Sequence, residues 1–162
     1  MDTFYSTLNT PDGPFTMVVH QNKVVASGWT NDFNELMKYL PGYETPSKKK
    51  MHDIETAVLD YYSGNFDKIL QVSVHTTSTP FTLRIWEALR KIPAGTVLSY
   101  TQLAKEAGNE RATRAAGTAC GKNPVSLFIP CHRALRSDGT LGGFGWGLNI
   151  KESLLSREKQ AN

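Results

Sequence analysis

The first thirty residues alternate short apolar runs with turn residues. Three runs rich in β-branched and aromatic side chains cover residues 3–8, 15–20 and 24–29. Turn-forming residues separate them at 11–14 (Pro-Asp-Gly-Pro) and at 21–23 (Gln-Asn-Lys). Apolar runs of this length between turns are typical of strands, so the chain is predicted to begin with a small antiparallel meander.

The rest of the first half shows helical spacing and one polar stretch. Apolar residues recur at helical spacing over 33–40, and a second helix is predicted over 53–62. Between them, residues 43–50 contain three lysines and are predicted to form an exposed loop. A short apolar run over 69–74 is predicted to form a strand, and nothing in this half carries recognisable catalytic chemistry.

The pattern changes after the first half of the chain. Thr79-Pro80 is typical of a helix start, because proline fits the first helical position, and apolar residues follow at helical spacing as far as Ile92. Trp86 lies on this helix and is predicted to belong to the core. The change divides the chain into a predicted N-terminal domain, residues 1–77, and a C-terminal domain, residues 78–162.

Two further short helices are predicted close together. Ser99 and Gln102 match a capping box that opens the first helix, which should end at Gly108. Asn109 is predicted to cap the second helix, over residues 110–120. Two short helices joined by a tight turn are a candidate helix-turn-helix. The second helix carries arginines among alanines and glycines, which suits either a closely approaching DNA backbone or tight helix packing.

Composition places the chain among ordinary globular proteins. It has 162 residues, 40% hydrophobic and 20% charged, and a net charge of +3 that is compatible with a polyanionic partner without requiring one. Two cysteines are too few for a disulfide framework or a cysteine zinc site, so neither a metal nor a cofactor is expected. No signal peptide or spanning apolar run is recognisable, so the expected location is the cytoplasm, or the nucleus if the source is eukaryotic.

The clearest chemistry lies in residues 128–133, Phe-Ile-Pro-Cys-His-Arg, which set a thiol beside an imidazole. A thiolate is the nucleophilic form of cysteine, and basic neighbours favour it at neutral pH. Adjacent side chains of an extended segment point to opposite sides, so His132 is expected to take the proton of Cys131 through a water molecule. A carboxylate beyond the imidazole would orient it, and Glu158 and Glu152 are both candidates.

Thiol hydrolases also use a cysteine and a histidine, but they bring these residues together from distant parts of the chain. The adjacency of Cys131 and His132 therefore argues against a protease or an amidase. The other cysteine, Cys120, falls within a helical pattern and is expected to be a small buried residue.

The setting of the Cys-His pair makes the motif specific. After the helix-turn-helix come Asn123-Pro124, then residues 130–133 (Pro-Cys-His-Arg), then the glycine-rich residues 139–147. This assembly resembles the O6-alkylguanine-DNA alkyltransferase family, also called methylated-DNA–protein-cysteine methyltransferases. The resemblance is strongest over residues 81–158, and the turn at 10–14 is similar to one in the family's first domain.

The resemblance implies an α/β (α+β) fold with two parts. A small N-terminal β-sheet domain with flanking helices, ribonuclease H-like, would have a structural role. A mostly helical, winged-helix-like C-terminal domain would contain the helix-turn-helix and the alkyl acceptor.

The resemblance also implies DNA repair by direct reversal in a single-turnover reaction. Cys131 would irreversibly take a methyl or larger alkyl group from O6-alkylguanine, with O4-alkylthymine as a further candidate substrate. His132, acting through water, and Glu158 would generate the thiolate. Tyr100 would contact the flipped base and donate a proton, and Asn123 would brace the turn before the nucleophile.

The implied partner is double-stranded DNA containing O6-alkylguanine, bound through the minor groove by a protein that is monomeric in solution, with cooperative assembly on DNA left open. Arg114 would fill the gap left by the extruded nucleotide. Further positions that match the family's DNA-contacting surface are Thr82, Thr101, Asn109, Ala112, Gly117 and Ser137. Positions that match the base pocket are Ala134, Phe144, Gly145 and Trp146. The backbone carbonyls of Cys131 and Ala134 and the N–H of Gly145 would read the guanine edge.

Two aromatic residues depart from the family's common pattern. Phe144 stands where a tyrosine is common, and Trp146 occupies a position that is small in many members. A bulky residue there should narrow the pocket, so poor reaction with large benzyl-type substrates is expected. Some members hold zinc in the first domain, but this chain lacks the cysteines that would bind it.

Two alternatives come from other functional classes. A protein that recognises alkylated bases without chemistry would lack the cysteine, so the intact Cys131 argues against it. A helix-turn-helix regulator with a sensing thiol would need an effector domain, and none is recognisable.

Overall fold

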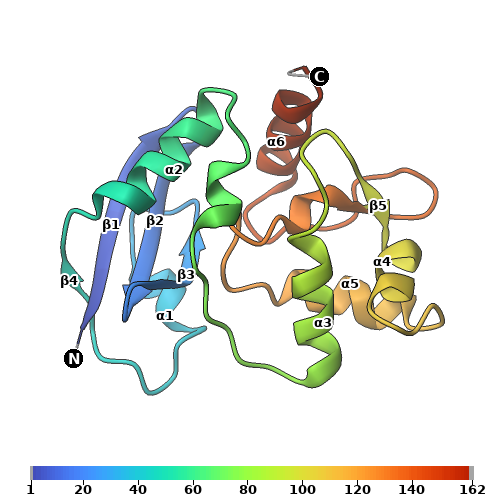
Figure 1. Cartoon of the computed structure of the whole chain (residues 1–162), viewed down its shortest axis with the longest axis horizontal. Helices are drawn as coiled ribbons and strands as arrows, with labels where there is room; N and C mark the ends of the chain where they lie inside the picture. The colour runs from blue at the N-terminus through green and yellow to red at the C-terminus, as the bar shows by residue number, and fades with distance from the viewer. Residues whose placement is uncertain (1, 161–162) are drawn as a thin grey trace. The chain divides into compact units, whose positions relative to one another are not determined.

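The computed structural model describes residues 2–160, and these residues form two compact units. The first unit takes the chain up to Thr76 together with Pro124–Phe128, and the second takes Thr77–Asn123 and the residues from Ile129 onward. Helices and strands are mixed along the chain, as the α/β prediction requires (Figure 1). Within residues 2–160, no helix combines the length and the apolar character needed to cross a membrane.

A four-stranded sheet in the order β3-β2-β1-β4 forms the first unit. β1 (Thr3–Thr10), β2 (Gly13–His20) and β3 (Lys23–Gly28) make the predicted antiparallel meander. Gly13 has a φ of +103° in the first turn, a conformation that glycine adopts without strain. Residues 15–19 of the inner strand β2 are all buried, so both faces of this strand are covered. Burial on both faces explains why this stretch is almost continuously apolar rather than alternating.

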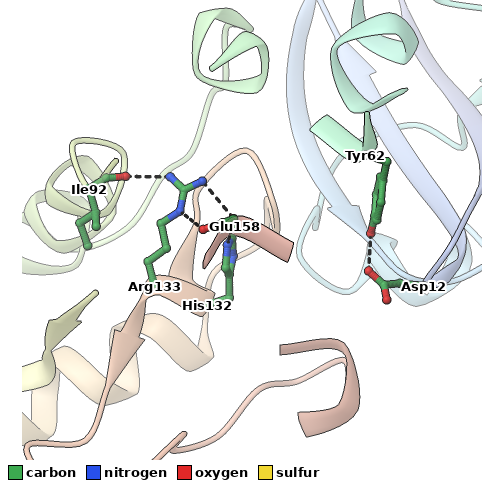
Figure 2. A network of polar contacts seen from close by, with 6 residues as sticks. All are labelled: Asp12, Tyr62, Ile92, His132, Arg133 and Glu158. Carbon is green, nitrogen blue, oxygen red and sulfur yellow. Dashed lines mark hydrogen bonds and ion pairs between the residues drawn. The ribbon is translucent and has the colours of Figure 1, made fainter. Parts of the chain in front are cut away.

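The helix α2 (His52–Tyr62) lies across the sheet of the first unit (Figure 1). Its buried face includes Val58 and Tyr61. At its end, the Tyr62 hydroxyl accepts a hydrogen bond from Trp29 Nε1 at 3.0 Å. The same hydroxyl donates one to Asp12 Oδ2 at 2.7 Å (Figure 2). This chain of bonds ties the helix to the first turn of the meander.

Residues 124–128 return to the first unit and lie along β3, where Val125 forms an isolated parallel bridge to Ser27. Ser27 N donates to Pro124 O at 2.9 Å, and Ser126 N donates to Ser27 O at 3.3 Å. The Ser27 hydroxyl adds a buried bond of 2.7 Å to Ser126 O. The chain is therefore held by the sheet just before it reaches Pro130 and Cys131. The sequence did not anticipate this return.

Four helices dominate the second unit: α3 (Pro80–Leu89), α4 (Tyr100–Glu106), α5 (Thr113–Gly121) and α6 (Leu148–Gln160). Two short strands, β5 (Leu98–Ser99) and β6 (Ala134–Leu135), pair in parallel. β5 leads directly into Tyr100, and β6 directly follows the 3₁₀ turn η2 (Cys131–Arg133). This pairing brings the start of α4 close to the Cys-His motif.

The helix-turn-helix is formed by α4 and α5. The capping box is confirmed, because Gln102 N donates to Ser99 Oγ at 3.0 Å and Ser99 N donates to Gln102 Oε1 at 2.8 Å. Gly108 follows α4 with a φ of +95°, as expected for a glycine that ends a helix. Trp86 of α3 is a core residue, as predicted, and its Nε1 donates to Ala119 O of α5 at 2.9 Å.

Two predictions in the first unit are wrong. The first half of the predicted strand over 69–74 lies in a 3₁₀ turn, η1 (Lys68–Gln71), and Val74 forms an isolated bridge to β3. The predicted loop over 43–50 contains β4 (Ser47–Lys48), which pairs in parallel with β1. Both segments are short, and the edge of the sheet rather than their own composition decides how they pair.

Two helix predictions need correction at their boundaries. The helix predicted over 33–40 is reduced to α1 (Asn34–Met37), which is followed by turns. The helix predicted to begin at Glu110 begins three residues later. The reason is local, because Asn109 Oδ1 accepts from Arg111 N at 3.2 Å and so stabilises a turn instead of capping α5.

Candidate active site

Cys131 opens the tight turn η2, directly after Pro130. Arg133 N donates to Pro130 O at 3.0 Å, so this part of the motif is a 3₁₀ turn and the prediction of an extended segment is wrong. The side chain of Cys131 is buried, with 6% of its surface exposed. Asn123 Nδ2 donates to Ile129 O at 2.8 Å and stabilises the backbone just before the thiol.

His132 forms a buried pair with Glu158. The distance from His132 Nε2 to Glu158 Oε2 is 2.6 Å, and the two side chains are 0% and 1% exposed. The second ring nitrogen, His132 Nδ1, is also buried and has no hydrogen-bond partner within residues 2–160. With Nε2–H donated to the carboxylate, Nδ1 carries the lone pair that a base needs.

The helix α6 decides which carboxylate meets the imidazole. Lys151, Leu154 and Glu158 are its buried residues, and their spacing of three and four places them on one face. Glu152 lies on another face and is exposed. The structure therefore pairs Glu158 with His132 and leaves Glu152 at the surface.

Arg133 completes this cluster and was not assigned a role from the sequence. Its Nε donates to Glu158 Oε1 at 2.8 Å, and a terminal nitrogen donates to Glu158 Oε2 at 3.1 Å. The other terminal nitrogen donates to Ile92 O at 2.7 Å (Figure 2). The side chains of Arg133 and Glu158 are 0% and 1% exposed, so this pair is shielded from bulk solvent.

Burial sets the protonation of the thiol and the imidazole at rest. It raises the pKa of Cys131, and a hydrogen bond with Asn123 and the charge of Lys151 only partly reverse this. The resting thiol is therefore protonated, contrary to the expectation that its neighbours favour the thiolate. Burial likewise lowers the pKa of His132, which leaves the imidazole neutral and able to act as a base.

Tyr100 packs between α5 and the glycine-rich loop. A Cβ placed on Gly117 would lie 4.0 Å from the Tyr100 ring, and a Cβ on Gly142 would lie 2.6 Å from the Tyr100 hydroxyl. Burial raises the pKa of Tyr100 to about 12, with smaller contributions from Cys120 and Cys131 in their thiolate forms. The phenol is therefore held in its O–H form within electrostatic reach of the thiol.

Lys151 is a site residue that the sequence reasoning missed. Its Nζ donates to Ala134 O at 2.8 Å, to Leu141 O, and to Gly143 O at 3.3 Å. The amine thereby joins α6 to the strand after the Cys-His motif and to the glycine-rich loop. The spacing of Lys151 from Leu154 and Glu158, three and seven residues along one helix face, was the sequence signal that could have found it.

The positions predicted to contact DNA fall mostly at the surface of the second unit. Thr101 Oγ1 lies 3.0 Å from Thr113 Oγ1 and 3.1 Å from Ser137 Oγ, so three hydroxyls gather where α4, α5 and the loop after β6 meet. Arg114 is exposed on α5, next to exposed Ala115. Thr113 was not predicted, and the other predicted positions are partly buried or exposed: Thr82, Asn109, Ala112 and Gly117.

The predicted pocket residues have mixed exposure. Ala134 is fully buried in β6, whereas Phe144 and Trp146 are partly buried and Gly145 is exposed in the loop before α6. Throughout residues 2–160, the histidine, cysteine and carboxylate side chains form no group of three or more suited to a metal ion.

A helix-turn-helix unit that also buries a cysteine beside a histidine–glutamate pair defines a class, the DNA-binding proteins that carry a nucleophilic thiol. The family model of the 6-O-methylguanine DNA methyltransferase DNA-binding domain matches residues 80–160. The methylated-DNA–protein-cysteine methyltransferase of Salmonella typhimurium is 38% identical over 157 residues, which cover 92% of this chain and 91% of the relative. The chain belongs to the methylated-DNA–protein-cysteine methyltransferase family.

Solved structures agree with this assignment over nearly the whole chain. The crystal structure of Mycobacterium tuberculosis O6-methylguanine methyltransferase matches with a TM-score of 0.80 and 31% identity, covering 99% of this chain and 94% of that one. The structure of Mycobacterium tuberculosis OGT in complex with DNA matches with a TM-score of 0.84 and 31% identity, covering 98% and 94%. The mixed α/β fold is therefore that of the family.

Proposed function

We propose that this protein repairs DNA by direct reversal, moving an alkyl group from O6 of guanine to Cys131 in a reaction that each molecule performs once. The observation that carries the proposal is the buried Cys131 beside a histidine whose Nε2 is bound to Glu158 and whose Nδ1 has no hydrogen-bond partner among residues 2–160. That arrangement, in the unit that contains a helix-turn-helix, combines a base-activated nucleophile with a DNA-binding motif.

Activation of the thiol is the first step. Because burial raises the pKa of Cys131, the proton has to be removed when the substrate is bound. Nδ1 of His132 is the base, reached through a water molecule, and Glu158 stabilises the imidazolium that forms. The charge of Lys151 lowers the pKa of Cys131 and so favours the thiolate.

The transfer is a single displacement. A bond forms between the Cys131 sulfur and the alkyl carbon as the bond from that carbon to O6 breaks, and the electron pair stays on the base. The Tyr100 hydroxyl donates a proton to the departing guanine, and overall the thiol proton replaces the alkyl group by way of His132 and solvent. The negative charge of the Cys131 thiolate contributes to the high pKa of Tyr100. The thioether carries no such charge, so the phenol becomes more acidic at the step in which it donates a proton to the guanine.

DNA is engaged by α5 in the minor groove. The target base has to leave the helical stack, because O6 is out of reach of a thiolate while the base is stacked. Arg114 fills the gap, and the small exposed side chain of Ala115 lets the DNA backbone approach. Contacts to the backbone come from the positions proposed above: Thr82, Thr101, Asn109, Ala112, Gly117 and Ser137.

The base pocket is proposed to lie beside Ala134, between the Cys-His motif and the glycine-rich loop. The carbonyl of Ala134 already accepts from Lys151, but a carbonyl oxygen has two lone pairs and can still accept from guanine. Phe144, Gly145 and Trp146 complete the pocket, and Trp146 is proposed to narrow it against large alkyl groups.

The remaining properties are proposed for the chain as a whole. Residues 1–77 form a structural domain, and the protein is a monomer in solution. Both cysteines are free thiols, which supports a reducing location, the cytoplasm or, in a eukaryote, the nucleus.

The proposal is tested by weighing the intact protein after incubation with a duplex that carries one O6-methylguanine. We expect the intact protein to gain one methylene group and to show no further turnover when the DNA is in excess. After digestion, the added mass should lie on the peptide that contains Cys131. Protein that binds the lesion tightly and keeps its mass would instead indicate recognition without chemistry.

Replacing Gly142 with alanine is expected to slow transfer by about ten- to a hundredfold, because the new Cβ would displace the Tyr100 hydroxyl and small misplacements have effects of this size. The φ of +72° at Gly142 adds about 1–2 kcal/mol of strain. Single-turnover rates and thermal unfolding measure both effects. Gly143→Ala is the matched control, because a Cβ there meets nothing within 4 Å. Equal rates for the two variants would contradict the role given to Tyr100.

A further inference from the structure

Arg133 binds the carboxylate of Glu158, the same group that binds the imidazole of His132. Its guanidinium uses three donors, two on the oxygens of Glu158 and one on the carbonyl of Ile92 in the turn after α3. The planar fork of arginine matches a carboxylate in this way, whereas a lysine offers a single point of contact. Both oxygens of Glu158 are therefore held by Arg133, and this fixes the orientation in which the carboxylate pairs with His132.

We propose that Arg133 is a positioning residue for alkyl transfer, which holds Glu158 oriented and charge-compensated so that His132 remains a neutral base. The proposal rests on the function proposed above, since it concerns the activation of Cys131. Arg133 would act through Glu158 and His132 and would not touch the DNA base.

The reason lies in the buried charges around the imidazole. The groups that act on His132 are Glu158 and Lys151 of α6 and Arg133 of its own turn, with the thiol of Cys131 next to it in the chain. A buried carboxylate whose only partner was the imidazole would draw a proton onto the ring, because an ion pair is the way to stabilise its charge. An imidazolium has donors at both nitrogens, so Nδ1 would lose the lone pair that accepts the thiol proton.

The guanidinium of Arg133 makes a proton on His132 unnecessary for stabilising the buried carboxylate. Arg133 supplies the positive charge that Glu158 needs, so the carboxylate stays ionised without a proton on His132. The pKa of His132 is lowered overall. Burial lowers it most, Glu158 raises it, and the charges of Arg133 and Lys151 lower it again. Among these groups, Arg133 is the one that contacts both oxygens of Glu158.

Replacing Arg133 with methionine keeps the length of the side chain and removes its charge and donors. We expect the acidic limb of the single-turnover rate profile to move to higher pH by about one unit, the size of shift that a neighbouring charge produces. At pH values on the acidic limb, the rate of Arg133→Met should be about tenfold below that of the unmodified protein. The reason is that a shift of one pKa unit changes the fraction of neutral imidazole by about that factor. Arg133→Lys should move the limb less, because it keeps the charge and loses the fork.

Direct titration of His132 separates this proposal from the function it rests on. NMR of the unmodified protein should find the imidazole neutral at pH 7, and NMR of Arg133→Met should find its pKa raised. These readouts do not need alkyl transfer, so a failure of the transfer assay would count against the proposed function alone. The exposed Lys159→Met, one residue from Glu158, is the charge-matched control and should move neither readout.

A second variant guards against a fold defect. In the double variant Arg133→Met with Glu158→Gln, no uncompensated carboxylate remains, so the pKa of His132 should fall back toward its value in the unmodified protein. The proposal is overturned if His132 is protonated at pH 7 in the unmodified protein. It is also overturned if the folded Arg133 variants titrate like the parent and lose rate equally at every pH, as a purely structural role would require.

Discussion

Replacing Cys131 with serine should abolish alkyl transfer while leaving binding to lesion-containing DNA nearly unchanged. Serine has nearly the same shape as cysteine. Its hydroxyl is much harder to deprotonate than a thiol, however, and is a far weaker nucleophile toward the alkyl carbon. The side chain is buried and its backbone bonds belong to η2, so the fold should be retained. Intact mass after incubation with O6-methylguanine DNA measures the loss, and a gel-shift assay measures the binding.

The second cysteine provides the matched control. Cys120 is buried in the last turn of α5, and burial raises its pKa, so it should not compete as an acceptor. Cys120→Ser should therefore gain one methylene group as the unmodified protein does. A gain of mass by Cys131→Ser, or its loss in Cys120→Ser alone, would move the acceptor to Cys120 and refute the assignment.

Replacing Lys151 with methionine should slow transfer by about a hundredfold or more. The amine joins Ala134 to the loop residues Leu141 and Gly143 by hydrogen bonds, and a catalytic loop displaced by about 1 Å can lose that factor by itself. The same substitution removes a positive charge that lowers the pKa of Cys131, which reduces the thiolate further, by about tenfold for each pKa unit. Single-turnover rates over a range of pH measure both contributions.

Stability distinguishes positioning from simple unfolding in the Lys151 variant. The substitution leaves the carbonyls of Ala134, Leu141 and Gly143 without this donor, so the free energy of unfolding should fall by about 1–3 kcal/mol while the protein stays folded. Lys159→Met, on the exposed face of the same helix, should keep both the rate and the melting temperature. A Lys151→Met protein that melts normally and transfers at the parental rate would show that the three carbonyl contacts are dispensable.

Local signals in the sequence predicted the regular elements well where the chain itself supplies the partner groups. The turn at Gly13, the capping box of Ser99 and Gln102, and the proline that opens α3 all act within a few residues, and all three are present. Predictions failed where the partner lies far away. β4 forms because β1 offers an edge with which it can pair, and the identities of Ser47 and Lys48 do not predict a strand.

The active site divides in the same way. The Cys-His-Arg motif and the small residues of α5 are contiguous, so their chemistry could be inferred from order alone. The choice of Glu158 over Glu152 depends on which face of α6 is buried. Lys151 and Arg133 act through hydrogen bonds to carbonyls and to a carboxylate. These partners lie between 8 and 41 positions away in the chain.

The sequence by itself therefore determined the family, the nucleophile and the helix-turn-helix, because these reside in short stretches whose residue types and spacing already specify the chemistry. Only the tertiary structure decided the state of the nucleophile and the partners of the base. Burial makes Cys131 a protonated thiol at rest, and the charges brought around it from α6 and η2 determine when it becomes a thiolate. The physical reason is that desolvation and Coulomb interaction depend on distance in space, which a linear order of residues does not contain.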